Sequence, residues 1–121
     1  MELQIDVREG APGLPVVDLK GEVDAYTAGK LKETIVGLIE KGEVKLVMNL
    51  ESVEYLDSTG VGILVGALKR LRERHGNLVL ICCNPRILHI FEITGLVKVF
   101  TICGTEQEAL DAVKGAKEEG R

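Results

Sequence analysis

Three oxygen-bearing side chains stand in a row within the stretch EYLDSTGVGILVGALKRL, residues 54–71: Asp57, Ser58 and Thr59, followed by Gly60. An apolar strand is predicted to end here and a helix to begin. Oxygen side chains at such a position accept hydrogen bonds from helix N–H groups that lack partners, so Asp57 or Ser58 is a candidate N-cap. A serine hydroxyl is also a possible nucleophile, which would suggest a small hydrolase that uses Ser58.

The hydrolase interpretation lacks its other parts. Ser58 lies in DSTG rather than in a GxSxG nucleophile elbow, and the only histidines are His75, at a predicted helix end, and His89, in a short apolar helix. The cysteines and histidines do not have the spacing of zinc ligands, and no Walker-type glycine-rich loop is present. We therefore expect no catalytic residue, no metal site and no cofactor.

The helix that follows this turn has an unusual outer face. At 100° per residue one apolar stripe must face the core; it consists of Val61, Leu64, Val65, Leu68 and Leu71. The opposite side carries Gly62, Ile63 and Gly66, together with Arg70 and Glu73. A glycine inside a helix costs roughly 1 kcal/mol relative to alanine, so two exposed glycines need a reason other than packing. Close approach of another molecule would supply that reason.

The chain alternates between strand and helix patterns. Period-two alternation predicts an edge strand over residues 3–7, paired through a hairpin with a second strand at 16–20. Buried strands are predicted at 44–50 and at 78–83, with the second as the best candidate for a central strand. A last short strand is predicted at 97–102.

Four helices are expected between and after these strands. The first carries Ala28, Leu31, Ile35, Leu38 and Ile39, with Thr27 as its N-cap, and stops near residues 41–42. The second runs from the DSTG turn to about residue 75. A short third helix follows Asn84, and a fourth follows a capping box at 105–108. This order predicts an α/β fold, a mixed sheet of four to five strands covered by about four helices.

Length and charge narrow the function further. The 121 residues make one domain, with a core over about residues 3–113 and a tail at 114–121 that is expected to fray. A net charge of −4 disfavours nucleic acid, and Glu73 interrupts the basic residues near position 70. No signal peptide or membrane span is visible, so we expect a cytoplasmic protein with no membrane partner. The cysteines at 82, 83 and 103 are expected to be buried, reduced thiols.

Three segments resemble a known family in order and spacing: GEVDAYTAGKL, LVMNLESVEYLDSTGVGILVGALK and NPRILHIFEITGLVKVFTICGTEQEAL. They resemble the STAS domains of bacterial anti-sigma factor antagonists (anti-anti-sigma factors), and the match runs from about residue 3 to residue 113. Its most specific element is the family's Asp-Ser-Ser/Thr-Gly motif after a buried strand, which here is Asp57-Ser58-Thr59-Gly60.

The resemblance implies partner switching. The serine at position 58 would be phosphorylated by an anti-sigma factor that is itself a serine kinase. The unphosphorylated chain would bind that factor and release the sigma factor, and a phosphatase of the PP2C type would reverse the modification. The chain would be a substrate and a ligand but not an enzyme. The expected partner-binding residues are Asp24, Asp57, Ser58, Thr59, Gly60, Gly62, Ile63 and Gly66.

Simple electrostatics gives such a switch a mechanism. A phosphate adds about −1.5 to −2 charge, which a helix N-terminus favours by roughly 0.3 to 1 kcal/mol. In a docked complex the phosphate would lose water beside Asp57, and beside Asp24 if the two turns are neighbours. One like-charge pair at about 6 Å costs roughly 3 kcal/mol at an effective dielectric constant of about 20, so repulsion exceeds the dipole term.

The alternative function for a chain with this fold is a STAS module for ligand sensing or scaffolding in a stress-signalling assembly.

Overall fold

The computed structural model describes residues 2–119, with the side chains of residues 116–119 left out of the description. Its centre is one five-stranded sheet in the order β1-β2-β3-β4-β5. The strands are β1 (Leu3–Ala11), β2 (Leu14–Val23), β3 (Lys45–Leu56), β4 (Asn77–Ile81) and β5 (Thr101–Cys103). The β1–β2 pair is antiparallel and the other pairs are parallel, which confirms the predicted mixed α/β sheet.

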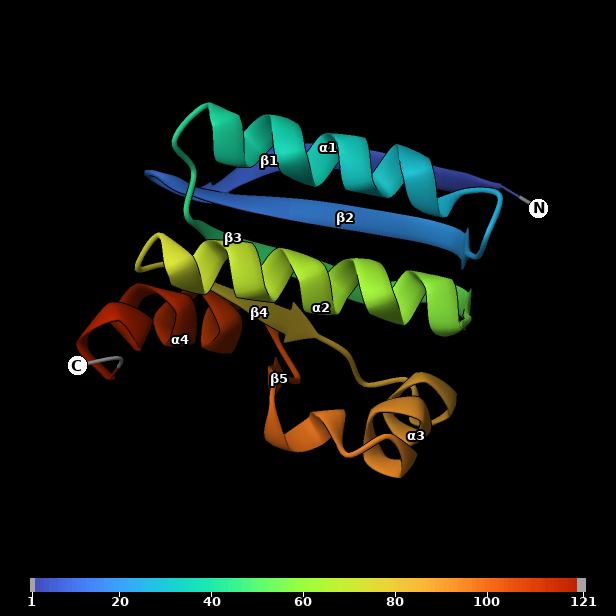
Figure 1. The fold of residues 1–121 in the computed structure, drawn as a ribbon. Helices are drawn as coiled ribbons and strands as arrows, with labels where there is room; N and C mark the ends of the chain where they lie inside the picture. The colour runs from blue at the N-terminus through green and yellow to red at the C-terminus, as the bar shows by residue number, and fades with distance from the viewer. Residues whose placement is uncertain (1, 120–121) are drawn as a thin grey trace.

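The helices lie on both faces of this sheet. They are α1 (Ala28–Glu40), α2 (Ser58–Glu73), α3 (Pro85–Ile93) and α4 (Glu106–Glu119), with a single 3₁₀ turn, η1 (Leu96–Lys98), before β5. In Figure 1, α1 and α2 run side by side across one face and begin at the same end of the sheet. The strands β2 and β3 that lead into them are parallel, so both helices start at the carboxyl edge of the sheet.

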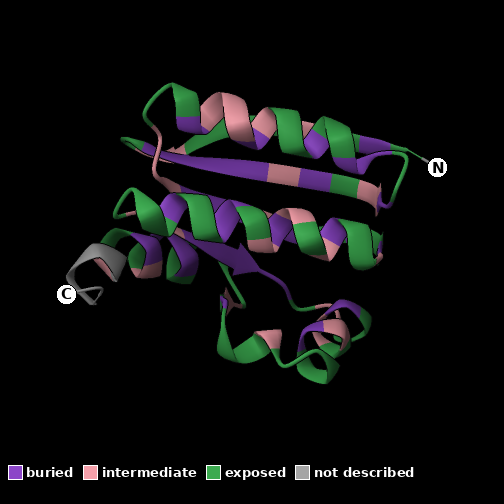
Figure 2. Cartoon of the chain, in the orientation of Figure 1, coloured by how far each residue is buried: buried purple, intermediate pink, exposed green. Residues whose placement is uncertain are grey.

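Alternation along the strands divides the interior into two cores. Val17, Met48 and Leu80 pack toward α1, α2 and α3, whereas their chain neighbours Val16, Val47 and Val79 pack toward α4. All six side chains are fully buried, which is why these strands read as continuous apolar runs (Figure 2). On α3, Phe91 contributes to the larger core through an edge-to-face contact with Phe100, at a centroid distance of 5.6 Å.

The first hairpin follows its prediction. Strand β1 is an edge strand whose residues 6–9 are exposed, and it pairs with β2 through a turn at residues 12–13. Gly21 holds a φ of +114°, and a Cβ at that position would lie 2.2 Å from the Glu2 carbonyl oxygen. The close approach of the two backbones therefore requires glycine there.

Several predicted boundaries were wrong. Strand β3 continues to Leu56 instead of ending near residue 50, because its second half also pairs with β2. Residues 78–81 of β4 are buried as expected, but the central position in the sheet belongs to β3. The segment predicted as one strand over 97–102 divides into η1 and a short β5. Helix α2 ends at Glu73, and His75 follows it with a φ of 64°.

Helix α4 is joined to the opposite edge of the sheet by a group of charged side chains, which we call the Arg8 clasp. Arg8 on β1 bonds to Asp18 on β2, with Nε 2.5 Å from Oδ2, and to Glu106 on α4, with Nη2 2.6 Å from Oε1. The bond from Arg8 lowers the Glu106 pKa. Burial disfavours the charged form of Asp18, but hydrogen bonds from Arg8 and Asn49 outweigh it and lower the Asp18 pKa.

The predicted capping box of α4 forms only in part. The Thr105 hydroxyl accepts a bond from Glu108 N at 3.2 Å, but the Glu108 carboxylate accepts from Gly104 N instead of Thr105 N. The expected fraying of residues 114–121 falls mostly on residues whose side chains or placement lie outside the description, and it stays a prediction.

Among the described residues, no helix combines the length and apolar character needed to cross a bilayer.

Candidate functional site

The strand–helix turns at Asp24 and Asp57 lie side by side. Val23 and Leu56 are paired in the parallel β2–β3 ladder, so the next residue of each strand leaves the sheet at the same level. Asp57 N donates to Val23 O at 3.1 Å, which connects the two turns directly. Together they form an open hollow of about 460 Å³ lined by Glu22, Asp24, Ala25, Tyr26, Tyr55 and Asp57. The neighbourhood of Asp24 and Asp57 that the switch mechanism requires is therefore present.

Asp57 is the N-cap of α2. Its extended backbone, with φ −99° and ψ −176°, lets Oδ1 accept a hydrogen bond from Gly60 N at 3.0 Å. Ser58 and Thr59 are then the first two residues of the helix, and both are exposed. Between the two candidate caps of the sequence, the structure thus selects Asp57 and leaves the Ser58 hydroxyl accessible at a helix N-terminus.

Gly60 has a packing role in this turn. A Cβ on Gly60 would lie 2.7 Å from both Leu56 Cδ1 and Val23 Cγ1. Real Cβ atoms do not approach that closely, so the absence of a side chain lets the first turn of α2 sit against β2 and β3. Because Gly60 is buried, its effect on a partner would be indirect, through the position of Ser58.

The Asp24 turn is more closed. Asp24 is 8% exposed, and its Oδ1 accepts hydrogen bonds from Tyr26 N at 2.9 Å and Thr27 N at 3.0 Å. Thr27 stands at the N-cap position of α1, as predicted, but its side chain makes no cap bond to the helix. The Thr27 hydroxyl instead accepts from Asp24 N at 3.0 Å and donates to Glu22 O at 2.8 Å. Asp24 and Thr27 therefore close the turn reciprocally.

The outer face of α2 is partly as predicted. Gly62 and Gly66 are exposed, and a Cβ added at either would meet no atom within 4 Å, so internal packing does not require glycine there. Ile63 was expected to be exposed but is half-buried against the larger core. Val61 and Val65 are also only half-buried, and Ala67 takes the buried place on the side toward α1.

Sequence reasoning missed two residues of this site, Tyr26 and Tyr55. They are the only tyrosines of the chain, and they are 91% and 52% exposed. Both line the hollow beside Asp24 and Asp57. The available signal was their rarity and placement, since each lies two residues from one of the two aspartates in a chain that is 3% aromatic. Exposed tyrosines are enriched among the residues that anchor protein interfaces.

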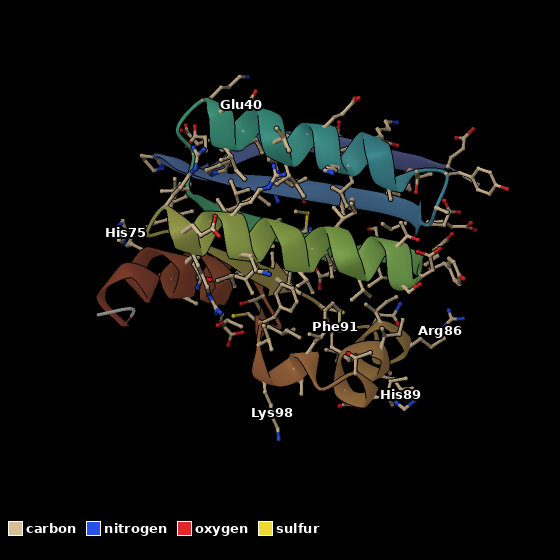
Figure 3. The ribbon with its side chains drawn as sticks, viewed as in Figure 1. Glu40, His75, Arg86, His89, Phe91 and Lys98 are labelled. Atoms are coloured by element: carbon tan, nitrogen blue, oxygen red, sulfur yellow. The ribbon has the colours of Figure 1, made fainter. Side chains whose placement is uncertain are left out.

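The geometry gives no support to a hydrolase at Ser58. His75 follows the carboxyl end of α2, where Figure 3 shows it. The helix that separates it from Ser58 is about 24 Å long at about 1.5 Å per residue. His89 lies on the exposed side of α3, where Nδ1 is 3.8 Å from the Glu92 carboxylate. Among the described residues, no three metal-binding side chains gather in one place.

The cysteines differ from their prediction in one respect. All three are free thiols, and Cys82 is buried, but Cys83 is exposed and Cys103 is half-buried. Burial raises the pKa of the Cys82 and Cys103 thiols. Cys83 falls just after β4 ends, so its side chain leaves the core and contacts Gly104 O.

Known proteins resemble this chain over nearly its whole length. Residues 3–109 match the STAS domain family. An anti-sigma-B factor antagonist of Listeria monocytogenes is 40% identical over 108 residues, which cover 89% of this chain and 95% of the relative.

Solved structures of two relatives have the same fold. The structure of an anti-sigma factor antagonist from Mycobacterium paratuberculosis has a TM-score of 0.84 at 30% identity, over 93% of this chain and 95% of that one. The Bacillus cell fate determinant SpoIIAA, in its phosphorylated form, has a TM-score of 0.72 at 26% identity, over 91% of this chain and 99% of that one.

Proposed function

The chain belongs to the STAS domain family, and we propose that it is an anti-sigma factor antagonist whose binding is switched by phosphorylation of Ser58. The observation that carries this proposal is an exposed serine in the first turn of α2, held beside two aspartates and two exposed tyrosines. The relatives named above as anti-sigma factor antagonists support the class of function. A relative with a phosphorylated form supports the kind of control.

In the proposed cycle the unphosphorylated chain binds an anti-sigma factor in the cytoplasm, and the sigma factor is released. The anti-sigma factor is also a serine kinase: the γ-phosphoryl group of ATP moves to Ser58 Oγ, ADP leaves, and a base of the kinase takes the hydroxyl proton. A phosphatase of the PP2C type hydrolyses the phosphoester to serine and inorganic phosphate. The chain supplies the acceptor hydroxyl and the binding surface and catalyses neither step.

The free protein can carry the phosphate at little cost. Ser58 begins α2, so the helix dipole favours the added charge by roughly 0.3 to 1 kcal/mol, and the unpaired N–H groups of the first turn are available as donors. The phosphate would replace no hydrogen bond, because the Ser58 hydroxyl makes none to the rest of the described chain. Phosphorylation should therefore leave the fold unchanged.

The docked state would not tolerate the same charge. A partner that covers the turn removes water from the phosphate while Asp57 and Asp24 stay close by. One such like-charge pair at about 6 Å costs roughly 3 kcal/mol at an effective dielectric constant of about 20. This exceeds the helix-dipole term, so the phosphorylated chain dissociates from the anti-sigma factor.

The partner surface proposed here includes the predicted residues around the turn and the outer face of α2: Asp24, Asp57, Ser58, Thr59, Gly62, Ile63 and Gly66. To these we add Tyr26 and Tyr55, which offer large exposed area on either side of the turn. An aromatic side chain that is already exposed buries apolar area without first breaking a packed contact.

The decisive experiment uses the purified chain, the anti-sigma factor of the same organism and ATP. Wild type should take up one phosphate, located at Ser58 by mass spectrometry. Ser58→Ala should take up none and should still bind the anti-sigma factor. Thr59→Ala is the matched control, because it removes the neighbouring exposed hydroxyl and should still be phosphorylated. Full phosphorylation of Ser58→Ala would move the site to another hydroxyl, and failure of wild type to bind would overturn the proposed function.

A further inference from the structure

A groove separates α1 from α2 on the outer surface of the molecule, and we call it the α1–α2 groove. It encloses about 150 Å³ and is lined by Lys32, Ile35, Val36, Gly62, Ile63, Gly66, Ala67 and Arg70. Its floor is apolar, because Ile35 and Ala67 are 2% and 4% exposed and belong to the larger core. The space is smaller than the roughly 300 Å³ at which small-molecule pockets begin, so it fits an inserted side chain better than a cofactor.

The two sides of the groove carry positive charge at its rim. Lys32 comes from α1 and Arg70 from α2, and both are exposed. Neither makes a salt bridge or a side-chain hydrogen bond within the part of the chain that is described. Two uncompensated cations beside an apolar floor are complementary to an apolar side chain flanked by carboxylates.

The groove continues from the phosphorylation turn. Ser58, Gly62, Gly66 and Arg70 follow one another at intervals of four residues, so each neighbours the next along the surface of α2. The acidic hollow lies at the beginning of this helix, and Arg70 lies three turns farther on, whereas Lys32 lies about one turn into the neighbouring α1. A partner that covers Ser58 and continues along α2 therefore meets negative charge first and positive charge last.

We infer that the α1–α2 groove receives an apolar side chain of the anti-sigma factor, with flanking carboxylates of that partner paired to Lys32 and Arg70. This inference rests on the proposed function and specifies the chemistry of its partner. It gives α1 a direct role in recognition, through Lys32 and Val36. It also explains why Gly62 and Gly66 are glycines, since a side chain at either position would cover the groove.

The test reverses the two rim charges one at a time. Lys32→Glu and Arg70→Glu each change the net charge by two units. Lys98→Glu makes the same change on η1, at a residue that does not line the groove and whose side chain points away from α1 and α2 in Figure 3. Affinity for the purified anti-sigma factor is measured by calorimetry at low and high salt. Each rim variant should bind about fivefold more weakly than wild type and the double variant about tenfold or more, with a lower association rate and a smaller salt dependence. Lys98→Glu should bind as wild type does.

The outcomes separate the two ideas. Thermal melts, and phosphate uptake at Ser58 with excess kinase, show that the variants are folded. If wild type binds and both rim variants bind as tightly as Lys98→Glu, the inference about the groove is wrong while the proposed function stands. If wild type itself fails to bind the anti-sigma factor, the proposed function is wrong. Equal weakening by all three variants would indicate a general charge effect and would also reject the groove.

Discussion

The turns at Asp24 and Asp57 begin neighbouring helices at the same level of the sheet, yet they leave different side chains free. In the first turn the carboxylate and the Thr27 hydroxyl bond to the backbone of the turn itself, and both side chains are buried. In the second turn Asp57 makes one cap bond, and the hydroxyls of Ser58 and Thr59 face solvent. In the closed turn the carboxylate and the hydroxyl are both used to hold the fold, whereas the open turn has hydroxyls that can be modified without breaking a hydrogen bond.

The largest expected effect comes from charging the open turn. Phosphorylation of Ser58 should weaken binding of the anti-sigma factor about a hundredfold, because a repulsion of roughly 3 kcal/mol is added in the docked state. Ser58→Asp should weaken it less, since one carboxylate carries about half the charge of a phosphate. Calorimetric titration of the three forms measures both effects. Tight binding by the fully phosphorylated chain would reject the electrostatic switch.

Removing each carboxylate should show that the closed turn contributes more to stability. Asp24→Ala leaves the N–H groups of Tyr26 and Thr27 without their acceptor in a buried site, so we expect a loss of about 2 to 3 kcal/mol in the free energy of unfolding. Asp57→Ala removes one N-cap hydrogen bond, from Gly60 N to the carboxylate, and should lower the free energy of unfolding by about 1 kcal/mol. Urea unfolding of both variants gives the comparison, and equal losses would contradict it.

Glycine substitutions on α2 test which glycines belong to the partner-binding surface and which are needed for internal packing. Gly66→Gln should leave stability unchanged or raise it by up to about 1 kcal/mol, because a Cβ meets nothing there, while binding to the anti-sigma factor falls. Gly60→Ala is the opposite control, since its Cβ would overlap Leu56 and Val23 and lower the melting temperature. If Gly66→Gln melts lower and binds normally, the surface has been placed on the wrong side of α2.

The smallest expected effect is on stability, at the start of α4, where Glu106 bonds to Arg8 in the Arg8 clasp. Asp18 and Glu106 have folded pKa values below their ordinary 3.8 and 4.5. Their contribution is therefore complete above about pH 4.5 and is lost as the pH falls through the lowered folded pKa values. Arg8→Gln should cost less than about 1 kcal/mol at pH 7, because solvent screens these partly exposed charges. Urea titrations at neutral and acid pH should show that this difference becomes smaller as the pH falls below about 4.5, and a constant difference would refute the assignment.

Many of the strands and helices could be predicted from the sequence because the residue patterns that indicate them are local. Period-two alternation and the DSTG turn placed β1, β2 and the start of α2. The extension of β3 was missed because residues 51–56 do not alternate: Val53 and Leu56 are the buried positions, three residues apart, and the pairing with β2 contains two register shifts. The break at 97–102 was missed because only residues 101–103 pair with β4, and no local pattern marks where that pairing begins.

The site shows the same limit. Asp57, Ser58 and the exposed glycines were visible in the sequence because they lie on one turn and one helix. The groove was not, because its other wall is α1, and no spacing within α2 reveals that Lys32 lies across from Arg70. Thr27 shows a related limit: it stands at the N-cap position of α1 as predicted, but its hydroxyl bonds to Asp24 N and Glu22 O of the preceding turn and not to the helix.

The pairing of Val23 with Leu56 also bears on how such a site withstands evolutionary divergence. Hydrogen bonds of the peptide backbone in the parallel ladder set the spacing between the two turns, and those bonds do not depend on which side chains the strands carry. Replacement of many core residues by others of suitable size therefore need not displace Asp57 relative to Asp24. Lineages that differ at most positions can therefore keep the same surface geometry.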